Sequence, residues 1–360
     1  MASFVIREGK ETDLPGIAQL AAEDETSAGD RNPDVFARCW RWLYLENPTQ
    51  AGHTLVGVTP EERVVGHYGL VPFSFRRNGE PLGTGGFLCQ LRVAESMRNQ
   101  FLFPQLEMRM LREYAPRGID FTYGLINRPA VLKAHLYFKF KPVFALSVLA
   151  RPVRLRNVLS EAVKNKALRT IMRPFAPLGD VALGLLRRPG GRGVRVERIE
   201  QFAAEMAADL TRLTRQFPIA AARTVETLNW RFATLKDREY RIHAATKNGA
   251  LAGYIVTRKM PMKQLTSLAV VDVLFAANDH GVANALINAA LREAKRKSVD
   301  VVACLLSADG PYYRAFKRNL FLRTPESFTL ILHEPPDAKH RLSDAPPADW
   351  HLTWFDHDFV

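Results

Sequence analysis

Cysteine is scarce in this sequence, and long apolar runs are missing from it. The 360 residues include three cysteines, Cys39, Cys89 and Cys304, and none of them forms a CxxC pair. Cysteines this widely spaced argue against a disulfide framework and a zinc site, and they fit a reducing cytoplasm. No apolar run approaches the ~20 residues that cross a bilayer, and residues 1–10 lack the layout of a signal peptide. We therefore expect a cytoplasmic protein that uses no metal.

Acidic residues are also few, because 37 Asp and Glu face 50 Lys and Arg, for a net charge of +13. The excess is concentrated in residues 151–192, where ten basic residues accompany only Glu161 and Asp180. Such a stretch attracts nucleic acid, anionic lipid, an acidic carrier protein or a phosphate-bearing cofactor, or it is a solvated linker. Nucleic acid is disfavoured because the stretch lacks the interleaved aromatic residues that stack on bases.

One pattern of motifs occurs twice along the chain. Residues 39–44 (CWRWLY) precede an alternating strand and then residues 64–70 (VVGHYGL). Residues 229–232 (NWRF) likewise precede a strand and then residues 251–256 (LAGYIV). The length exceeds that of a usual single domain, so the repetition predicts two similar domains.

Hydrophobic periodicity and turn residues predict the same order of elements in both halves. In the first half we expect strands at residues 4–8, 53–58, 63–76, 83–93, 121–125 and 143–153, and helices from residue 13 and at 33–45, 100–114 and 130–138. In the second half we expect strands at residues 194–199, 240–246, 251–260, 265–276, 299–306 and 327–333, and helices at 202–215, 223–235, 281–297 and 311–318.

The boundaries follow from this order. We expect a first domain at residues 1–155, a basic helical linker at 156–192, a second domain at 193–335 and a Pro-rich tail at 336–360. The tail is expected to be an extended arm on the surface. Its end carries Asp356, His357 and Asp358, which are metal-ligand residue types but only weak evidence for a metal site.

The order β-α-α-β-β-β-α-β-α-β resembles that of the GCN5-related N-acetyltransferase (GNAT) family. The resemblance implies an α/β (α+β) fold of two tandem GNAT-like domains, each a mixed, mostly antiparallel sheet flanked by helices. In this family an Arg/Gln-x-x-Gly-x-Gly/Ala segment enters the long helix after the fourth strand. Its glycines let the backbone approach the pyrophosphate of coenzyme A, and the helix N-terminus attracts the charge.

The first domain carries such a segment from Val93 onward. Arg98 stands at the basic position, whereas Phe101 replaces the glycine. Asn127 follows the next strand, where its amide could bond the pantetheine arm or cap a turn. The resemblance implies cofactor binding by Val93, Arg98, Asn99, Gln100, Phe101, Leu102, Phe103 and Asn127.

The second domain keeps different parts of the segment. Gly281 and Ala283 fit the pattern, but Asn278 replaces the basic residue and Asp279 adds a negative charge. These residues either bind a second cofactor or are retained only as a helix N-terminus.

A tyrosine on the short helix after the fifth strand often protonates the departing thiolate in this family. Tyr137 occupies that position in the first domain, and Phe316 occupies it in the second. The resemblance therefore assigns the general acid to Tyr137.

The base that accepts the amine proton is harder to place, since Gln90 and Arg92 stand where the family often has a carboxylate. His67 on the preceding strand could titrate near neutrality, and Glu95 is the nearest carboxylate. Asp272 is the second domain's candidate, unless it pairs with a buried arginine.

These residues indicate an N-acyltransferase that moves an acyl group from acetyl-CoA or another acyl-CoA to a primary amine. The resemblance extends to bacterial tandem acetyltransferases, whose acceptors are small amines, amino sugars or amino acids. The first domain is expected to be the active one. Transfer from an acyl carrier protein, aminoacyl transfer and a non-catalytic scaffold remain alternatives. Residues 158–186 could also dock peripherally on an anionic membrane at its inner face.

Overall fold

The structure is a computed structural model that describes residues 3–23, 32–162, 173–262, 264–336, 338 and 341–357. The chain forms two compact units. Unit 1 comprises residues 1–144, 329–345 and 357–359, and unit 2 comprises residues 145–328, 346–356 and 360.

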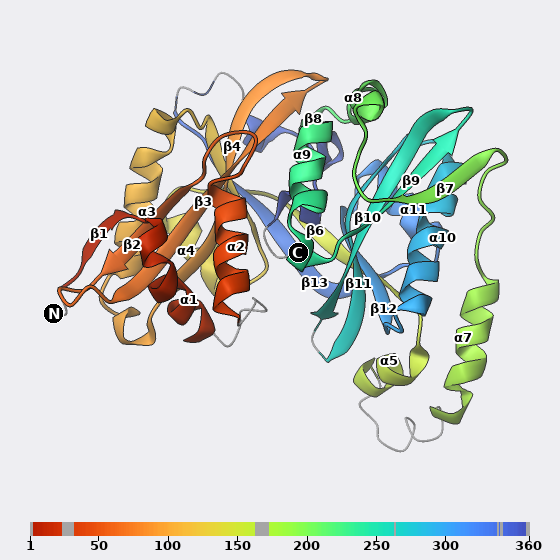
Figure 1. Cartoon of the computed structure of the whole chain (residues 1–360), viewed down its shortest axis with the longest axis horizontal. Helices are drawn as coiled ribbons and strands as arrows, with labels where there is room; N and C mark the ends of the chain where they lie inside the picture. The colour runs from red at the N-terminus through yellow and green to blue at the C-terminus, as the bar shows by residue number, and fades with distance from the viewer. Residues whose placement is uncertain are drawn as a thin grey trace. The chain divides into compact units, whose positions relative to one another are not determined.

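Unit 1 is built on a mixed sheet whose strands follow the order β1-β2-β3-β4-β5-β13 (Figure 1). Neighbouring strands are antiparallel except for β4 and β5, which are parallel. The strands are β1 (Val5–Glu8), β2 (His53–Val58), β3 (Val64–Arg77), β4 (Glu80–Val93), β5 (Phe121–Ile126) and the end of β13 (Leu322–His333).

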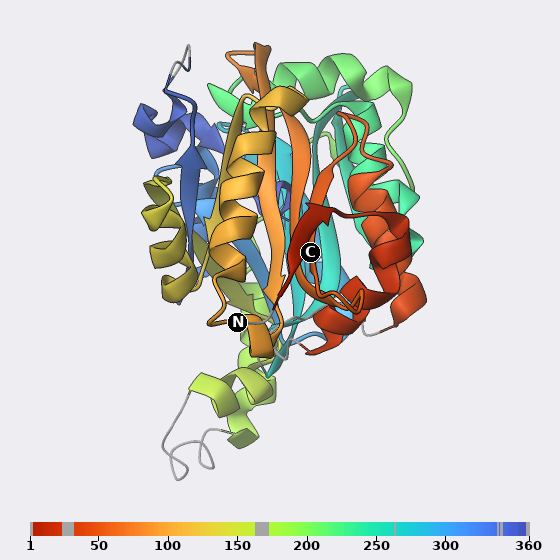
Figure 2. The same cartoon turned by 90° about the vertical axis from the view of Figure 1, so that its left-hand side faces the viewer.

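The helices of unit 1 are α1 (Leu14–Glu23), α2 (Pro33–Tyr44), α3 (Leu102–Glu113) and α4 (Pro129–Tyr137). Figure 2 shows α3 on one side of the strands and α1 and α2 on the other. Gly66 and Gly69 on β3 permit this close packing. A Cβ on Gly66 would meet Leu102 of α3, and one on Gly69 would meet the Tyr44 hydroxyl of α2.

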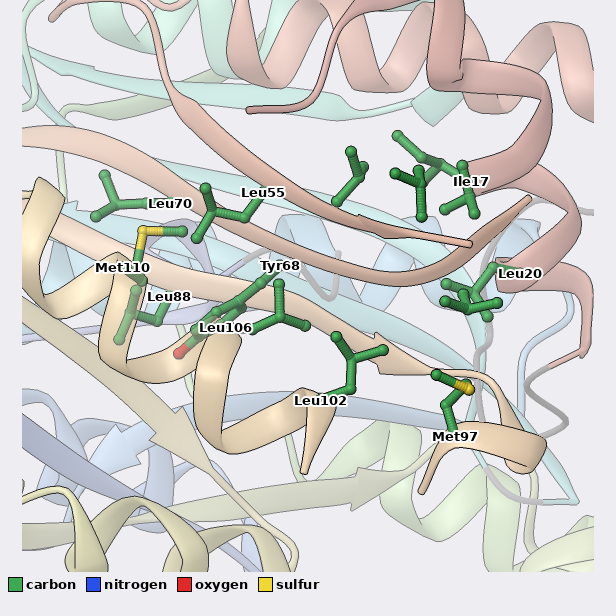
Figure 3. Close-up of a cluster of buried hydrophobic side chains, with 14 of the residues drawn as sticks. Ile17, Leu20, Leu55, Tyr68, Leu70, Leu88, Met97, Leu102, Leu106 and Met110 are labelled. Atoms are coloured by element: carbon green, nitrogen blue, oxygen red, sulfur yellow. The ribbon is translucent and has the colours of Figure 1, made fainter. Parts of the chain in front are cut away.

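The core of unit 1 lies between α3 and the strands. Leu102, Leu106 and Met110 occupy successive turns of α3 and point toward Tyr68 and Leu88 (Figure 3). All five side chains are buried. The spacing of these apolar positions explains why residues 102–113 form a helix with one face against the sheet.

Unit 2 repeats the arrangement in the strand order β6-β12-β11-β10-β9-β7. The one parallel pair on this path is β11 with β12, within the part of the chain that the structure describes. The strands are β6 (Lys141–Pro152), β7 (Val194–Ile199), β8 (Ile219–Ala221), β9 (Arg241–Lys247), β10 (Ala250–Met262), β11 (Leu265–Phe275), β12 (Val301–Ser307) and β14 (Trp350–His351). The helices are α5 (Leu155–Ala162), α7 (Ala176–Leu185), α8 (Ala207–Thr214), α9 (Val225–Asn229), α10 (His280–Arg296) and α11 (Pro311–Arg318).

Two expected elements of unit 2 differ from the structure. The helix expected at residues 223–235 is α only over Val225–Asn229, and a π-helical turn follows over Trp230–Thr234. The tail is not the expected surface arm, because Trp350, Trp354 and Phe355 are buried. The tail also supplies β14, which pairs with β8. No helix in the described part of the chain is long and apolar enough to cross a membrane.

Candidate acyl-cofactor site

The sheet of unit 1 opens between β4 and β5. Their parallel ladder contains three residue pairs, from Gly85 with Phe121 to Phe87 with Tyr123. Beyond these pairs β4 continues to Val93 and β5 continues to Ile126 without further pairing in the described ladder. Backbone groups along an unpaired edge need partners, so this opening can accept an extended ligand.

A bulge in β4 accompanies the opening. His67 faces Arg92 and Gly69 faces Cys89, so two residues of β4 lie opposite one residue of β3. Gln90 within the bulge has a left-handed backbone, with φ at 53°. A bulge bends its strand and increases the local twist, which turns the end of β4 away from a flat ladder.

The loop after β4 leads into the N-terminus of α3 with glycine-like geometry. Phe101 is the N-cap residue and has φ at 59°, the left-handed region that favours glycine. Its side chain is 72% exposed, so the ring does not cover the backbone from within the core. The Phe101 side chain makes no capping hydrogen bond, and no acidic residue lies in the first turn of α3. The amides of Leu102 and Phe103 and the helix dipole can therefore attract an anion from outside, whereas Pro104 has no N–H to donate.

The predicted cofactor residues of this loop divide into exposed and buried groups. Arg98 and Asn99 are exposed, Gln100 is half-buried, and Val93 is half-buried at the end of β4. Leu102 is fully buried in the core, so only its backbone can contact a ligand. The exposed Arg98 is therefore the residue of this segment that can supply a positive charge.

Aromatic contacts bring the α3 N-terminus close to Tyr137 on α4. The ring centroid of Phe103 lies 5.7 Å from that of Phe138, and Phe138 lies 5.4 Å from Tyr137. The Tyr137 side chain is 84% exposed. Asn127 is exposed just after β5, and β5 ends at the same edge of the sheet as the parallel strand β4. The loop residues, Asn127 and Tyr137 thus gather around one edge of unit 1.

His67 and Glu95 lie in opposite environments. His67 is fully buried, and its Nδ1–H donates to the Gln90 carbonyl at 3.1 Å, whereas its Nε2 has no hydrogen-bond partner among the described residues. Burial, reinforced by the Arg92 charge, lowers the pKa of His67 to about 3. The expectation that His67 titrates near neutrality is therefore wrong. Glu95 is exposed on the short 3-10 helix that precedes the loop.

A buried polar group of unit 1 escaped the sequence analysis. Glu107 on α3 is fully buried, and its Oε2 accepts a hydrogen bond from the Tyr68 hydroxyl at 3.0 Å. The same oxygen lies 3.2 Å from Nδ1 of His135 on α4. Glu107 therefore links α3 to the helix that carries Tyr137. The one available signal was a carboxylate directly after Leu106, on the apolar side of an amphipathic helix.

Unit 2 also opens between its parallel strands, but its own side chains fill the region. The pairing of β11 with β12 ends at Val270 with Cys304. The Tyr312 hydroxyl donates to the carbonyl oxygen of Phe275 at 2.5 Å and lies 2.8 Å from the Phe275 amide nitrogen. The Tyr312 ring stacks on Phe275 with centroids 4.1 Å apart. The backbone at the end of β11 is thus already bonded within the protein.

Asp272, the candidate base of unit 2, is a structural residue. It is fully buried and accepts hydrogen bonds from Tyr254 at 2.6 Å and Thr353 at 2.8 Å. Arg223 lies 3.4 Å away, which confirms the alternative that Asp272 pairs with a buried arginine.

The C-terminal tail completes this buried cluster. Asp356 accepts from Arg223 at 2.9 Å, and the Arg223 guanidinium lies 4.4 Å from the centre of the Phe355 ring. Asp356 therefore serves an ion pair, and Asp358 lies outside the described residues. Within the described residues, no group of three His, Cys, Asp or Glu side chains could hold a metal ion.

The N-terminus of α10 carries its own anion. Asp279 is the N-cap and accepts from the Val282 amide at 3.0 Å and from Lys247 at 2.7 Å. Burial opposes ionisation of Asp279, but the Lys247 hydrogen bond and the helix amides lower its pKa overall. A Cβ on Gly281 would meet the Gly191 Cα, and Ala283 is buried. These candidate cofactor residues instead cap and pack the helix.

Comparison with known proteins identifies the fold. No family model and no curated protein matches the sequence. Among solved structures, N-myristoyltransferase from Saccharomyces cerevisiae with bound myristoyl-CoA is similar over 98% of this chain and 90% of its own, with a TM-score of 0.66 and 13% identity. A GCN5-related N-acetyltransferase from Kribbella flavida is similar over 92% of this chain and 71% of its own, with a TM-score of 0.59 and 15% identity. The chain has the GNAT fold. This confirms the fold class that the order of elements predicted.

A probable N-acyltransferase from Enterococcus faecalis is also similar, with a TM-score of 0.60 and 8% identity over 92% of this chain and 73% of its own. At these identities the similarity establishes the fold, and the chemistry must be argued from the residues of this chain.

Proposed function

We propose that the protein is an N-acyltransferase that transfers an acyl group from acyl-CoA to a primary amine, using unit 1. The observation that carries this proposal is the uncapped N-terminus of α3. It combines the left-handed backbone of Phe101 with the exposed Arg98, at the sheet edge where β4 and β5 separate. The fold, which is shared with a protein that binds myristoyl-CoA, supports this assignment.

The residues present fit coenzyme A. The backbone amides of Leu102 and Phe103 and the Arg98 guanidinium would bind the pyrophosphate, because both kinds of donor attract anions. The unpaired edge of β4 and the exposed amide of Asn127 would bond the pantetheine arm. Acyl-CoA supplies the thioester, and this chain supplies its orientation.

The reaction is a direct attack in a ternary complex. The amine nitrogen forms a bond to the thioester carbonyl carbon, and the bond from that carbon to sulfur breaks. The exposed Tyr137 hydroxyl would protonate the departing thiolate. Glu95 is the accessible carboxylate among the candidates for the amine proton, whereas buried His67 would accept one poorly at neutral pH. Positioning of the two substrates would supply a large part of the rate enhancement.

Isothermal titration of the full chain with coenzyme A, acetyl-CoA and myristoyl-CoA tests the proposal. We expect binding, and we expect Arg98→Ala to weaken it by about tenfold or more, because a charge-assisted bond to phosphate is lost. Arg112→Ala is the matched control, since Arg112 is an exposed arginine in the last turn of the same helix. If none of the three ligands binds, the proposal fails. Binding of an acyl carrier protein in their place would favour a carrier-dependent transferase.

A further inference from the structure

One helix of unit 2 presents an apolar surface to solvent. Phe175, Leu178, Val181, Leu185 and Leu186 are between 60% and 80% exposed. Four of them are spaced by three or four residues, so they follow one side of α7. Large apolar side chains that gather on an exposed surface usually mark an interaction site.

The contacts of the other side of α7 fix this orientation. The Leu183 carbonyl accepts a hydrogen bond from the buried Arg151 at 2.8 Å, and the Asp180 carboxylate accepts one from the Leu155 amide of α5 at 2.7 Å. Ala176 is buried. The less exposed side of α7 consists of Ala176, Gly179, Asp180 and Leu183, whereas Leu178, Val181 and Leu185 face outward.

Basic residues border this apolar face. Arg187 and Arg188 directly follow the end of α7, and Arg154 and Arg156 lie at the start of α5. The acidic residues of this region that the structure describes are Asp180 and Glu161, and the four arginines outnumber them. The surface therefore combines an apolar stripe with an excess of positive charge.

An anionic lipid surface suits both properties. A helix that lies in the membrane interface buries its apolar side among the acyl chains, while its arginines contact lipid phosphates. An acidic carrier protein would satisfy the arginines but would not bury five large apolar side chains. A second copy of this chain would bring positive charges together, which is unfavourable. We propose that α7 docks unit 2 on the surface of an anionic membrane. This inference goes beyond the proposed function and does not depend on it.

Co-sedimentation with lipid vesicles tests the docking. The full chain should bind vesicles of phosphatidylcholine with phosphatidylglycerol, and bind those of phosphatidylcholine alone much more weakly. The double variant Leu178→Ser with Leu185→Ser should reduce binding at least tenfold, because two leucine side chains no longer leave water. The double variant Arg156→Gln with Arg188→Gln should reduce it about 30-fold, at about 1 kcal/mol for each charge. Leu322→Ser, on an exposed leucine of β13, is the matched control and should bind like the original chain.

A fluorescent label gives a second measurement that does not rely on sedimentation. The three native cysteines are buried, so a single cysteine in Leu185→Cys can be labelled selectively with a polarity-sensitive dye. Its emission should shift to shorter wavelength with anionic vesicles, whereas a label in Leu322→Cys should not respond. Absence of binding and of the shift would overturn the proposal. Loss of self-association in the leucine variant, or capture of a carrier protein without vesicle binding, would also overturn it and assign α7 to that partner.

Discussion

Helices α3 and α10 follow corresponding strands, β4 and β11, but their N-termini carry different charges. In α10 the N-cap Asp279 places a carboxylate on the helix amides and pairs with Lys247. In α3 the N-cap Phe101 offers the amides no side-chain partner. One helix end supplies its own anion, whereas the other leaves room for an external one. Two helices at corresponding places in a repeated fold can thus differ in the charge at their N-termini, and under the proposed function only the α3 end would bind a phosphate.

The openings in the two sheets differ in the same way. Tyr312 bonds the backbone of Phe275 in unit 2, and the tail packs Asp356 against Arg223. In unit 1 the described residues around the opening include the exposed Asn127 and Tyr137. In unit 2 the corresponding groups are therefore bonded within the protein, whereas in unit 1 polar side chains remain exposed.

Removal of Arg223 should have the largest effect on stability. Arg223→Ala leaves the carboxylates of Asp272 and Asp356 buried without their cation, which should lower the free energy of unfolding by about 3–5 kcal/mol. Denaturant unfolding measures this change. Arg215→Ala removes an exposed arginine of the same unit and should change stability little. An effect of Arg223→Ala no larger than that of the control would show that the buried cluster does not hold unit 2 together.

Replacing Glu107 of α3 by the residue at the corresponding position of α10 should have the next largest effect on stability. Counted from Leu106 and Leu286, Glu107 of α3 corresponds to the buried Ile287 of α10. Glu107→Ile removes the acceptor of the Tyr68 hydroxyl and the partner of His135, so we expect a loss of about 2–4 kcal/mol in unfolding free energy.

The conservative variant separates packing from hydrogen bonding at this position. Glu107→Gln keeps an oxygen that can accept from Tyr68 and should recover at least half of the loss. If the isoleucine variant is as stable as the original chain, the buried Glu107 does not join α3 to α4.

Acid should destabilise unit 1 through His67. Its pKa in the folded chain is about 3 against 6.5 for the ordinary side chain, so the unfolded chain binds a proton first as the pH falls. The free energy of unfolding should therefore decrease between pH 6.5 and pH 3, by up to about 1.4 kcal/mol per pH unit from this group. His67→Gln should show a shallower dependence, whereas His280→Gln, at an exposed site, should not. Equal slopes in His67→Gln and the original chain would contradict this assignment.

Much of the fold was predictable because its signals are local. The alternation of apolar residues predicted a strand at residues 53–58, and the structure confirms it as β2, His53–Val58. Asn32 and Pro33 start α2 where expected, since the Asn32 side chain accepts from the Asp34 amide at 2.9 Å. The Trp40 and Trp42 side chains of this helix are buried.

The remaining features depend on residues that are distant in the sequence. Asp356 is buried because it pairs with Arg223. This arginine lies 133 positions earlier in the chain, so no local pattern reveals the pair. The tail looked like a polar surface arm for this reason. The neutrality of His67 likewise follows from burial beneath neighbouring strands and helices. In the candidate site, the loop and Tyr137 stay predictions of the sequence, which could not show that Phe101 adopts a glycine-like backbone.

The number of coenzyme A molecules bound per chain shows whether unit 1 alone binds the cofactor. Calorimetric titration should give one site. Phe101→Asp places a carboxylate beside the first turn of α3 and should weaken binding by at least about 30-fold, because like charges repel the pyrophosphate. Aspartate tolerates the left-handed backbone, so the fold should be kept. Phe101→Gly should retain binding, because glycine adopts the same backbone. Two sites per chain, or unchanged affinity in Phe101→Asp, would contradict a single coenzyme A site at the N-terminus of α3.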